Sequence, residues 1–242
     1  MARLNVAAAD RLLTTTRSVR RRLDLNGNVD LAVVRQCLDV AQQAPSGSNN
    51  RAYRWVVVQD ADRRRALADI YRKGLGEYAR ATAELEQRGF EGRVEVTKDD
   101  TTPARDAQTR RVFASARHLT EHLAEVPVHV VPCMLGRLPE TYDNFRAAAF
   151  YGSIHPAVWS LMLALRARGY GSVYTSLHLV HEREAAELLG IPDHVTQVGL
   201  VPIAPYLGED FRPADRGPID EITYVDGWGR SEVPLSPRPD FA

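Results

Sequence analysis

A long apolar segment, residues 145–168, constrains the fold more than any other feature of this sequence. Its most apolar part contains Trp159, Leu161, Met162, Leu163 and Leu165. A helix without a polar face has to be buried on both sides, so we expect this segment in the core or in a subunit interface. Pro156 is expected in the first turn of the helix or at a kink within it.

Short valine-rich runs alternate with helical patterns along the rest of the chain. Asp30 can cap a helix that ends before Pro45, and Gly169 can end the long apolar helix. The expected strands cover residues 55–58, 126–135 and 195–203. We also expect one helix that ends at residue 16, another over 182–189, and an extended piece at 222–225. This alternation predicts an α+β or α/β domain.

Residues 61–123 have a charged, helical pattern that is interrupted at 89–103. The interruption is polar and has little hydrophobic content, so we expect a loop or lid between two helices.

The charges balance, with 31 Lys and Arg against 31 Asp and Glu in 242 residues. A neutral chain has no electrostatic reason to bind nucleic acid or an anionic membrane, although a local basic cluster could hold one small anion. Cys37 and Cys133 stand far apart in apolar stretches, which indicates reduced, buried thiols. No signal peptide and no run of about 18 uncharged apolar residues is apparent. We therefore expect a cytoplasmic protein.

Two familiar motifs do not carry the function. The letters G-x-G-x-x-A begin at Gly74, but a charged helical pattern precedes them instead of the buried strand that a dinucleotide-binding loop needs, so we expect a helix break there. His118 and His122 frame an H-x-x-E-H sequence, the spacing of a zinc site, but the sequence nominates no clear third ligand. We expect no metal.

Two polar turns are more informative. Arg17, Ser18 and Arg20 form the pattern R-S-x-R, in which two guanidinium groups and a hydroxyl can hold a phosphate. The turn at residues 45–49 offers short side chains, backbone N–H groups and an amide, which suit a planar heterocycle. Either turn alone is commonly only a solvated charge cluster or a helix-stopping loop.

The order of five motifs resembles that of the nitroreductase family of FMN-dependent oxidoreductases. In the first half, R-S-x-R is followed by a helix, then by A-P-S-G-x-N and a valine strand. The second half contains R-G-Y-G-S at 168–172, L-G-I-P at 189–192 with G-L-V-P-I-A at 199–204, and R-G-P-I-D-E at 216–221. The resemblance implies a three-layer α+β fold whose mostly antiparallel sheet is flanked by helices. It also implies one domain over residues 1–242, a variable helical or lid region at 60–125, a long buried helix at a dimer interface and an extended C-terminal arm.

The same resemblance implies FMN as cofactor. Arg17, Ser18 and Arg20 would bind its phosphate and ribityl chain, with Arg216 as a further phosphate partner. Pro45, Ser46 and Asn49 would lie along the flavin of the neighbouring subunit in a homodimer. Arg51 stands where the family has glutamine, and it would stabilise negative charge on the reduced flavin if it points inward. The backbone of Tyr174, Thr175, Ser176 and Leu177 would face the flavin ring, with one N–H directed at N5.

The implied activity is NAD(P)H-dependent, ping-pong reduction of a nitroaromatic or quinone, carried by the flavin without a catalytic base. Tyr71, Tyr78, Phe90 and Phe113 are the aromatic candidates for stacking on the acceptor, with ordinary helix packing as the alternative for each. Two other readings stay open. One is a flavin enzyme of the same fold with other chemistry, such as reductive dehalogenation or flavin cleavage, and the other is a flavin-binding protein without turnover.

Overall fold

The computed structural model of the protein describes residues 4–87, 103–209, 211–214 and 216–229. The chain divides into a main unit, residues 17–208, and a terminal unit formed by residues 1–16 and 209–242. The terminal unit contains α1 (Val6–Thr15) and a 3-10 turn at Ile219–Ile222. The extended piece predicted at 222–225 is therefore wrong at its start, because Ile222 belongs to that turn.

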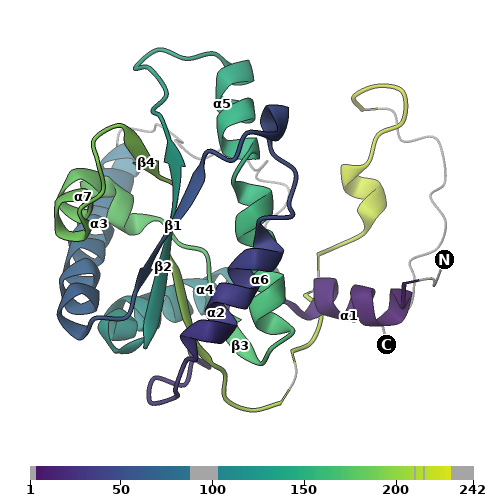
Figure 1. Ribbon diagram of the computed structural model, residues 1–242. Helices are drawn as coiled ribbons and strands as arrows, with labels where there is room; N and C mark the ends of the chain where they lie inside the picture. The colour runs from purple at the N-terminus through teal and green to yellow at the C-terminus, as the bar shows by residue number, and fades with distance from the viewer. Residues whose placement is uncertain (1–3, 88–102, 210, 215, 230–242) are drawn as a thin grey trace. The chain divides into compact units, whose positions relative to one another are not determined.

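A five-stranded sheet forms the centre of the main unit (Figure 1). Its strands are β1 (Tyr53–Val58), β2 (Val128–Leu135), β3 (Tyr170–Ser172), β4 (Val195–Gln197) and β5 (Val201–Pro205). The order is β1-β2-β5-β3, β4 also pairs with β2, and every pair is antiparallel. The mostly antiparallel sheet and the α+β class are thus confirmed.

Three of the strands, β3, β4 and β5, differ from the predicted pattern. The single strand predicted over 195–203 is β4 and β5, separated at residues 198–200. A side chain at Gly199 would overlap the ring of Tyr174, so this glycine marks a close approach inside the break. The long apolar helix ends at Arg166, earlier than the predicted Gly169, which lies in the following turn with a left-handed φ of +80°; residues 170–172 then form β3.

Helices α2 (Leu31–Ala41) and α6 (His155–Arg166) lie on one face of the sheet (Figure 1). Asp30 caps α2, as predicted, by accepting a 2.8 Å hydrogen bond from the Ala32 N–H. The apolar segment 145–168 is two helices, because two residues, Ser153 and Ile154, separate α5 (Asn144–Gly152) from α6. Pro156 lies in the first turn of α6, as predicted, and the inner side of α6 is buried in the apolar core.

Helices α3 (Ala61–Gln87) and α7 (Glu182–Leu189) cover the opposite face, and α4 (Pro103–His122) leads into β2 (Figure 1). Helices therefore flank the sheet on both sides. Seven of the eight residues of β2 are buried, as expected for a strand covered on both faces. The predicted lid at 89–103 lies outside the described residues except for Pro103, which begins α4.

The stretch Asn144–Arg166 also has the length and composition of a membrane span, with a mean hydropathy of 1.3 in its most apolar window, although the sequence was expected to contain no such stretch. The same test is passed by core helices, and α6 packs against α2 and the sheet. Cys37 and Cys133 are both buried and unbridged, as predicted.

Candidate functional site

The basic turn that contains Arg17, Ser18 and Arg20 runs along the free edge of β3. Ser18 forms a parallel bridge with Ser172, and the Val19 N–H donates to the Ser172 carbonyl at 2.9 Å. A Cβ atom on Gly171 would lie 2.9 Å from Cγ1 of Val19, so the turn approaches the strand closely only because that residue is glycine. Since β3 leads directly into residues 174–177, the fold brings together two segments that lie about 155 residues apart.

Three side chains from different elements meet beside this turn, and we call them the Arg20–Tyr71–Thr175 cluster. The Tyr71 hydroxyl on α3 lies 2.6 Å from Oγ1 of Thr175. Arg20 interacts electrostatically with Tyr71, and its guanidinium donates to the Ser115 hydroxyl on α4 at 3.4 Å. The turn, the variable helical region and the residues after β3 therefore converge at one place.

Burial changes the titration of the Arg20–Tyr71–Thr175 cluster. It lowers the pKa of Arg20 from its usual value, and the neighbouring Tyr71 opposes that shift. It raises the pKa of Tyr71, and the hydrogen bond between Tyr71 and Thr175 and the charge of Arg20 oppose that rise. A neutral phenol thus stands beside a cation that has lost part of its water, which is a suitable environment for an oxygen-rich anion.

The four aromatic residues expected to stack on an acceptor are placed very differently. Tyr71 is 2% exposed and offers no ring face to a ligand. Tyr78 on α3 and Phe113 on α4 are 52% and 56% exposed, and their role in acceptor binding stays a prediction. Phe90 lies outside the described residues.

The stretch Tyr174 to Leu177 is held by its backbone and by its neighbours. The Thr175 N–H donates to the Leu200 carbonyl at 2.9 Å, and the Leu200 N–H returns the bond at 2.7 Å. This bond excludes the Thr175 N–H as the flavin-facing donor and leaves those of Tyr174, Ser176 and Leu177. The Tyr174 hydroxyl donates to the Val198 carbonyl and lies 3.2 Å from Nε2 of His155.

Helix α3 packs along the same stretch. A side chain at Gly74 would overlap the Leu177 carbonyl, and one turn later Glu77 pairs with His181 at 3.1 Å. We call the contacts of Tyr71, Gly74 and Glu77 the α3 seam. The G-x-G-x-x-A letters are part of this continuous helix, so the predicted helix break is wrong and the first glycine serves close packing.

The turn at residues 45–49 lies on the junction of α5 and α6. The Gly47 N–H donates to the Ser153 hydroxyl at 3.0 Å, and that hydroxyl donates to the Ala149 carbonyl. Ser48 and Asn49 both have a φ of 53°, a left-handed conformation that is uncommon for non-glycine residues and is found preferentially at functional sites. Pro45 and Asn49 are exposed and Ser46 is half-buried.

The other two arginines of the predicted site, Arg51 and Arg216, belong to other parts of the chain. Arg51 is exposed, and its carbonyl accepts a hydrogen bond from Arg54 at 2.9 Å. Arg216 belongs to the terminal unit, so its convergence with Arg17 and Arg20 stays a prediction. The sequence reasoning missed Ser115, because nothing in the charged pattern of α4 distinguishes this serine.

The H-x-x-E-H sequence lies on α4, where the rings of His118 and His122 are 4.5 Å apart. Nδ1 of His122 lies 2.8 Å from the Glu125 carboxylate. Within the described part of the chain, no group of three His, Cys, Asp or Glu side chains gathers as a metal site would require.

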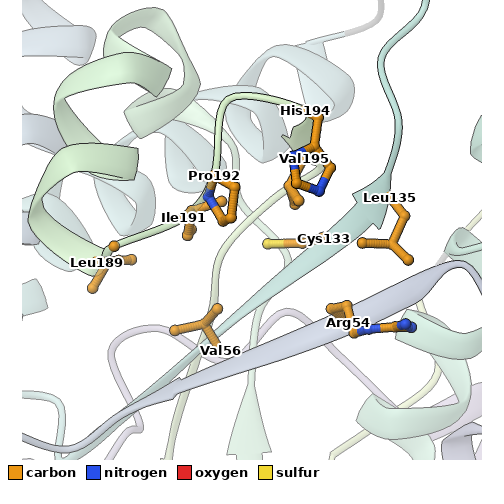
Figure 2. A pocket seen from close by; sticks show the side chains of 10 residues that line it. Arg54, Val56, Cys133, Leu135, Leu189, Ile191, Pro192, His194 and Val195 are labelled. Atoms are coloured by element: carbon orange, nitrogen blue, oxygen red, sulfur yellow. The ribbon is translucent and has the colours of Figure 1, made fainter.

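A cavity of about 270 Å³ lies elsewhere, beside β1, β2 and the loop after α7 (Figure 2). Most of its lining is apolar, including Val56, Leu135, Leu189 and Ile191, and Cys133 lies at its floor. The Arg54 side chain at its edge donates to the carbonyls of Arg51 and Tyr53. None of the predicted site residues lines it, so we place the candidate site at the Arg20–Tyr71–Thr175 cluster.

Known proteins of similar structure share this fold. The FMN-dependent nitroreductase NfnB from Mycobacterium smegmatis, solved with NADPH, is 21% identical with a TM-score of 0.65, covering 92% of this chain and 99% of that one. A BluB-like flavoprotein from Clostridium difficile 630 is 17% identical with a TM-score of 0.63, covering 93% of this chain and 99% of that one. An iodotyrosine deiodinase bound to FMN and 3-iodo-L-tyrosine is 20% identical with a TM-score of 0.58, covering 86% of this chain and 94% of that one.

The family comparison covers most of the main unit. The nitroreductase family model matches residues 13–204, which include Arg17 and Arg20 of the basic turn, all of α3 and α6, and the stretch after β3. The chain therefore belongs to the nitroreductase family.

Proposed function

We propose that the protein is an FMN-dependent oxidoreductase that takes electrons from NADPH or NADH and reduces a small nitroaromatic or quinone. The observation that carries the proposal is the half-buried Arg20, which among the described residues makes a single side-chain hydrogen bond, of 3.4 Å. A desolvated guanidinium with unused donors, next to the stretch expected to face a flavin, fits a phosphorylated cofactor.

In this proposal the basic turn and the stretch after β3 hold the cofactor. Arg17, Ser18 and Arg20 bind the phosphate and ribityl chain, and Arg216 adds a further charge from the terminal unit. The stretch Tyr174 to Leu177 faces the ring. When bound, FMN supplies the redox chemistry by accepting a hydride and passing the electrons to the acceptor. The protein binds and orients, and it provides no obligatory acid or base.

The proposed active form is a cytoplasmic homodimer. Pro45, Ser46 and Asn49, with Arg51 at the end of the turn, then face the flavin of the partner subunit, and α6 lies near the interface. Tyr78 and Phe113 offer ring faces for the acceptor. A yellow protein that elutes near twice 27.0 kDa is the expected result of gel filtration.

The cofactor site is tested by replacing Arg20. Arg20→Ala is expected to weaken FMN binding at least tenfold, since charge-assisted hydrogen bonds contribute about 1.5–3 kcal/mol. Arg21→Ala is the matched control, because Arg21 is exposed in the same turn and has no place in the proposed site. Equal FMN affinity of the two variants, measured by flavin fluorescence, would show that the site is misplaced.

The reaction is tested by mixing the oxidised protein anaerobically with NADPH or NADH. Bleaching of the flavin band, followed by its return on adding a nitroaromatic or quinone, is expected. A flavin that never bleaches with either donor would identify a binding protein without turnover. Return of the band only with a halogenated aromatic would instead favour dehalogenation, the chemistry suggested by the name of the deiodinase neighbour.

A further inference from the structure

We propose that Tyr71 is a positioning residue that orients the Thr175 hydroxyl as a hydrogen-bond donor toward a ring oxygen of FMN. This inference rests on the proposed function, since it concerns the same cofactor. It assigns Tyr71 a part different from acceptor stacking, for which its ring is too deeply buried.

The count of hydroxyl protons leads to this assignment. Tyr71 and Thr175 each carry one O–H, and a single hydrogen bond of 2.6 Å joins their oxygens. One proton lies in that bond and the other remains available. The pair therefore carries one spare donor, whichever oxygen donates.

Burial determines which oxygen keeps the spare proton. Tyr71 is 2% exposed, whereas Thr175 is half-buried. If Thr175 donated, the Tyr71 proton would be left without a partner inside the protein, which costs about 1–3 kcal/mol. With Tyr71 as the donor, the spare O–H belongs to Thr175, where water or a ligand can accept it. Burial also raises the pKa of Tyr71, so its proton stays in place.

The position of Thr175 is fixed on both sides. Its backbone exchanges two hydrogen bonds with Leu200, of 2.9 and 2.7 Å, so the hydroxyl cannot swing away with the main chain. From the other side, α3 comes close enough to reach it only because Gly74, one turn after Tyr71, has no side chain to meet the Leu177 carbonyl. A hydroxyl held in this way donates in a defined direction.

The positive charge of Arg20 indicates which kind of oxygen accepts the hydrogen bond from Thr175. Arg20 places a half-buried cation next to Tyr71. A donor beside a cation favours an oxygen that is negative or strongly polarised. Thr175 lies in the stretch expected to face the flavin ring, so the inferred acceptor is a ring carbonyl oxygen and not the phosphate.

The test measures binding of FMN and of riboflavin, which lacks the phosphate, to the cofactor-free protein. Tyr71→Phe and Thr175→Val are each expected to weaken both ligands alike, by about fivefold, the size of one net hydrogen bond. The double variant is expected to lose no more than either single variant, because both changes abolish the same oriented hydrogen bond from Thr175. Thr175→Ser keeps the hydroxyl and is expected to restore binding.

Tyr170→Phe is the matched control, since it also deletes one tyrosine hydroxyl contact, to the Asp30 N–H at 3.3 Å, away from the cluster. Wild-type affinity in Tyr71→Phe, additive losses in the double variant, or a loss for FMN but not riboflavin would each overturn the inference while leaving the proposed function intact. A wild-type protein that binds neither ligand would overturn the proposed function itself. Should Tyr71→Phe not fold, the comparison of Thr175→Val with Thr175→Ser decides the question.

Discussion

The side chains buried on the two faces of the sheet differ in polarity. Under α2 and α6 the core is apolar, and Leu161 and Leu165 of α6 pack there fully buried against Val130, Val201 and Ile203 of the sheet. Under α3 and α7 the buried side chains include His129 of β2, His178 and Gln197. We call these the apolar face and the polar face.

The two faces are expected to contribute differently to the stability of the fold and to the candidate site. Burial of aliphatic side chains on the apolar face contributes free energy in proportion to the area removed from water. On the polar face each buried group needs a partner to offset its desolvation. Nε2 of His129 lies 2.9 Å from the Leu123 carbonyl, and His178 is buried next to Gln197 and Glu182. The candidate site lies along α3, so the face with the buried polar side chains is the one that carries the site.

Acid should destabilise the polar face more than any single substitution. The pKa of His129 is lowered to about 4, mainly by burial and also by the nearby charges of Arg64 and His178, against the opposing effect of the hydrogen bond to Leu123. Burial also lowers the pKa of His178 to about 4, against the attraction of Glu182. Both values are below the ordinary 6.5, so the unfolded chain takes up protons first as the pH falls. Stability is therefore lost from about pH 6.5 down to about pH 4, by roughly 3 kcal/mol for each histidine.

Urea unfolding at pH 7 and pH 4 measures this loss, with His178→Gln as the variant that isolates one of the two rings. The variant is expected to show about half of the histidine-dependent fall, whatever its stability at pH 7. An identical fall in the variant and the wild type would show that His178 does not titrate in this way.

The apolar face should respond to lost volume and not to pH. Leu161 is fully buried in α6, so Leu161→Ala is expected to lower the unfolding free energy by about 2–5 kcal/mol through lost burial and a cavity. The loss should be equal at pH 7 and pH 5. Leu163→Ala on the same helix is the control, because its half-buried side chain should cost less than half as much. A strongly pH-dependent loss in Leu161→Ala would contradict the separation of the two faces.

Local signals predicted those elements whose cause is local. The Asp30 cap, Pro156 in the first turn of α6 and the left-handed Gly169 each follow from the chemistry of one residue and its immediate neighbours. The order of the polar turns in the sequence likewise identified the family.

Features with a distant cause were not predictable. The break at Gly199 depends on the ring of Tyr174, and the burial of Tyr71 depends on the packing of α3 against residues 175–181. The sequence therefore nominated the residues of the basic turn and of the stretch after β3, but it assigned Tyr71 to the acceptor and passed over Ser115.

The α3 seam gives the smallest effect and the sharpest control, because two glycines of one helix meet different surroundings. A Cβ atom on Gly76 would have nothing within 4 Å, so Gly76→Ala is expected to stabilise the protein by about 0.5–1 kcal/mol through the restriction of the unfolded chain and better helix propensity. In Gly74→Ala the same gain is offset by about 1–3 kcal/mol of overpacking against the Leu177 carbonyl. Since Leu177 has to move, Gly74→Ala should also bind FMN more weakly, while Gly76→Ala binds it as the wild type does. Urea unfolding and FMN titration of the two variants measure both effects, and equal behaviour of the two would mean that the α3 seam does not position the stretch that faces the cofactor.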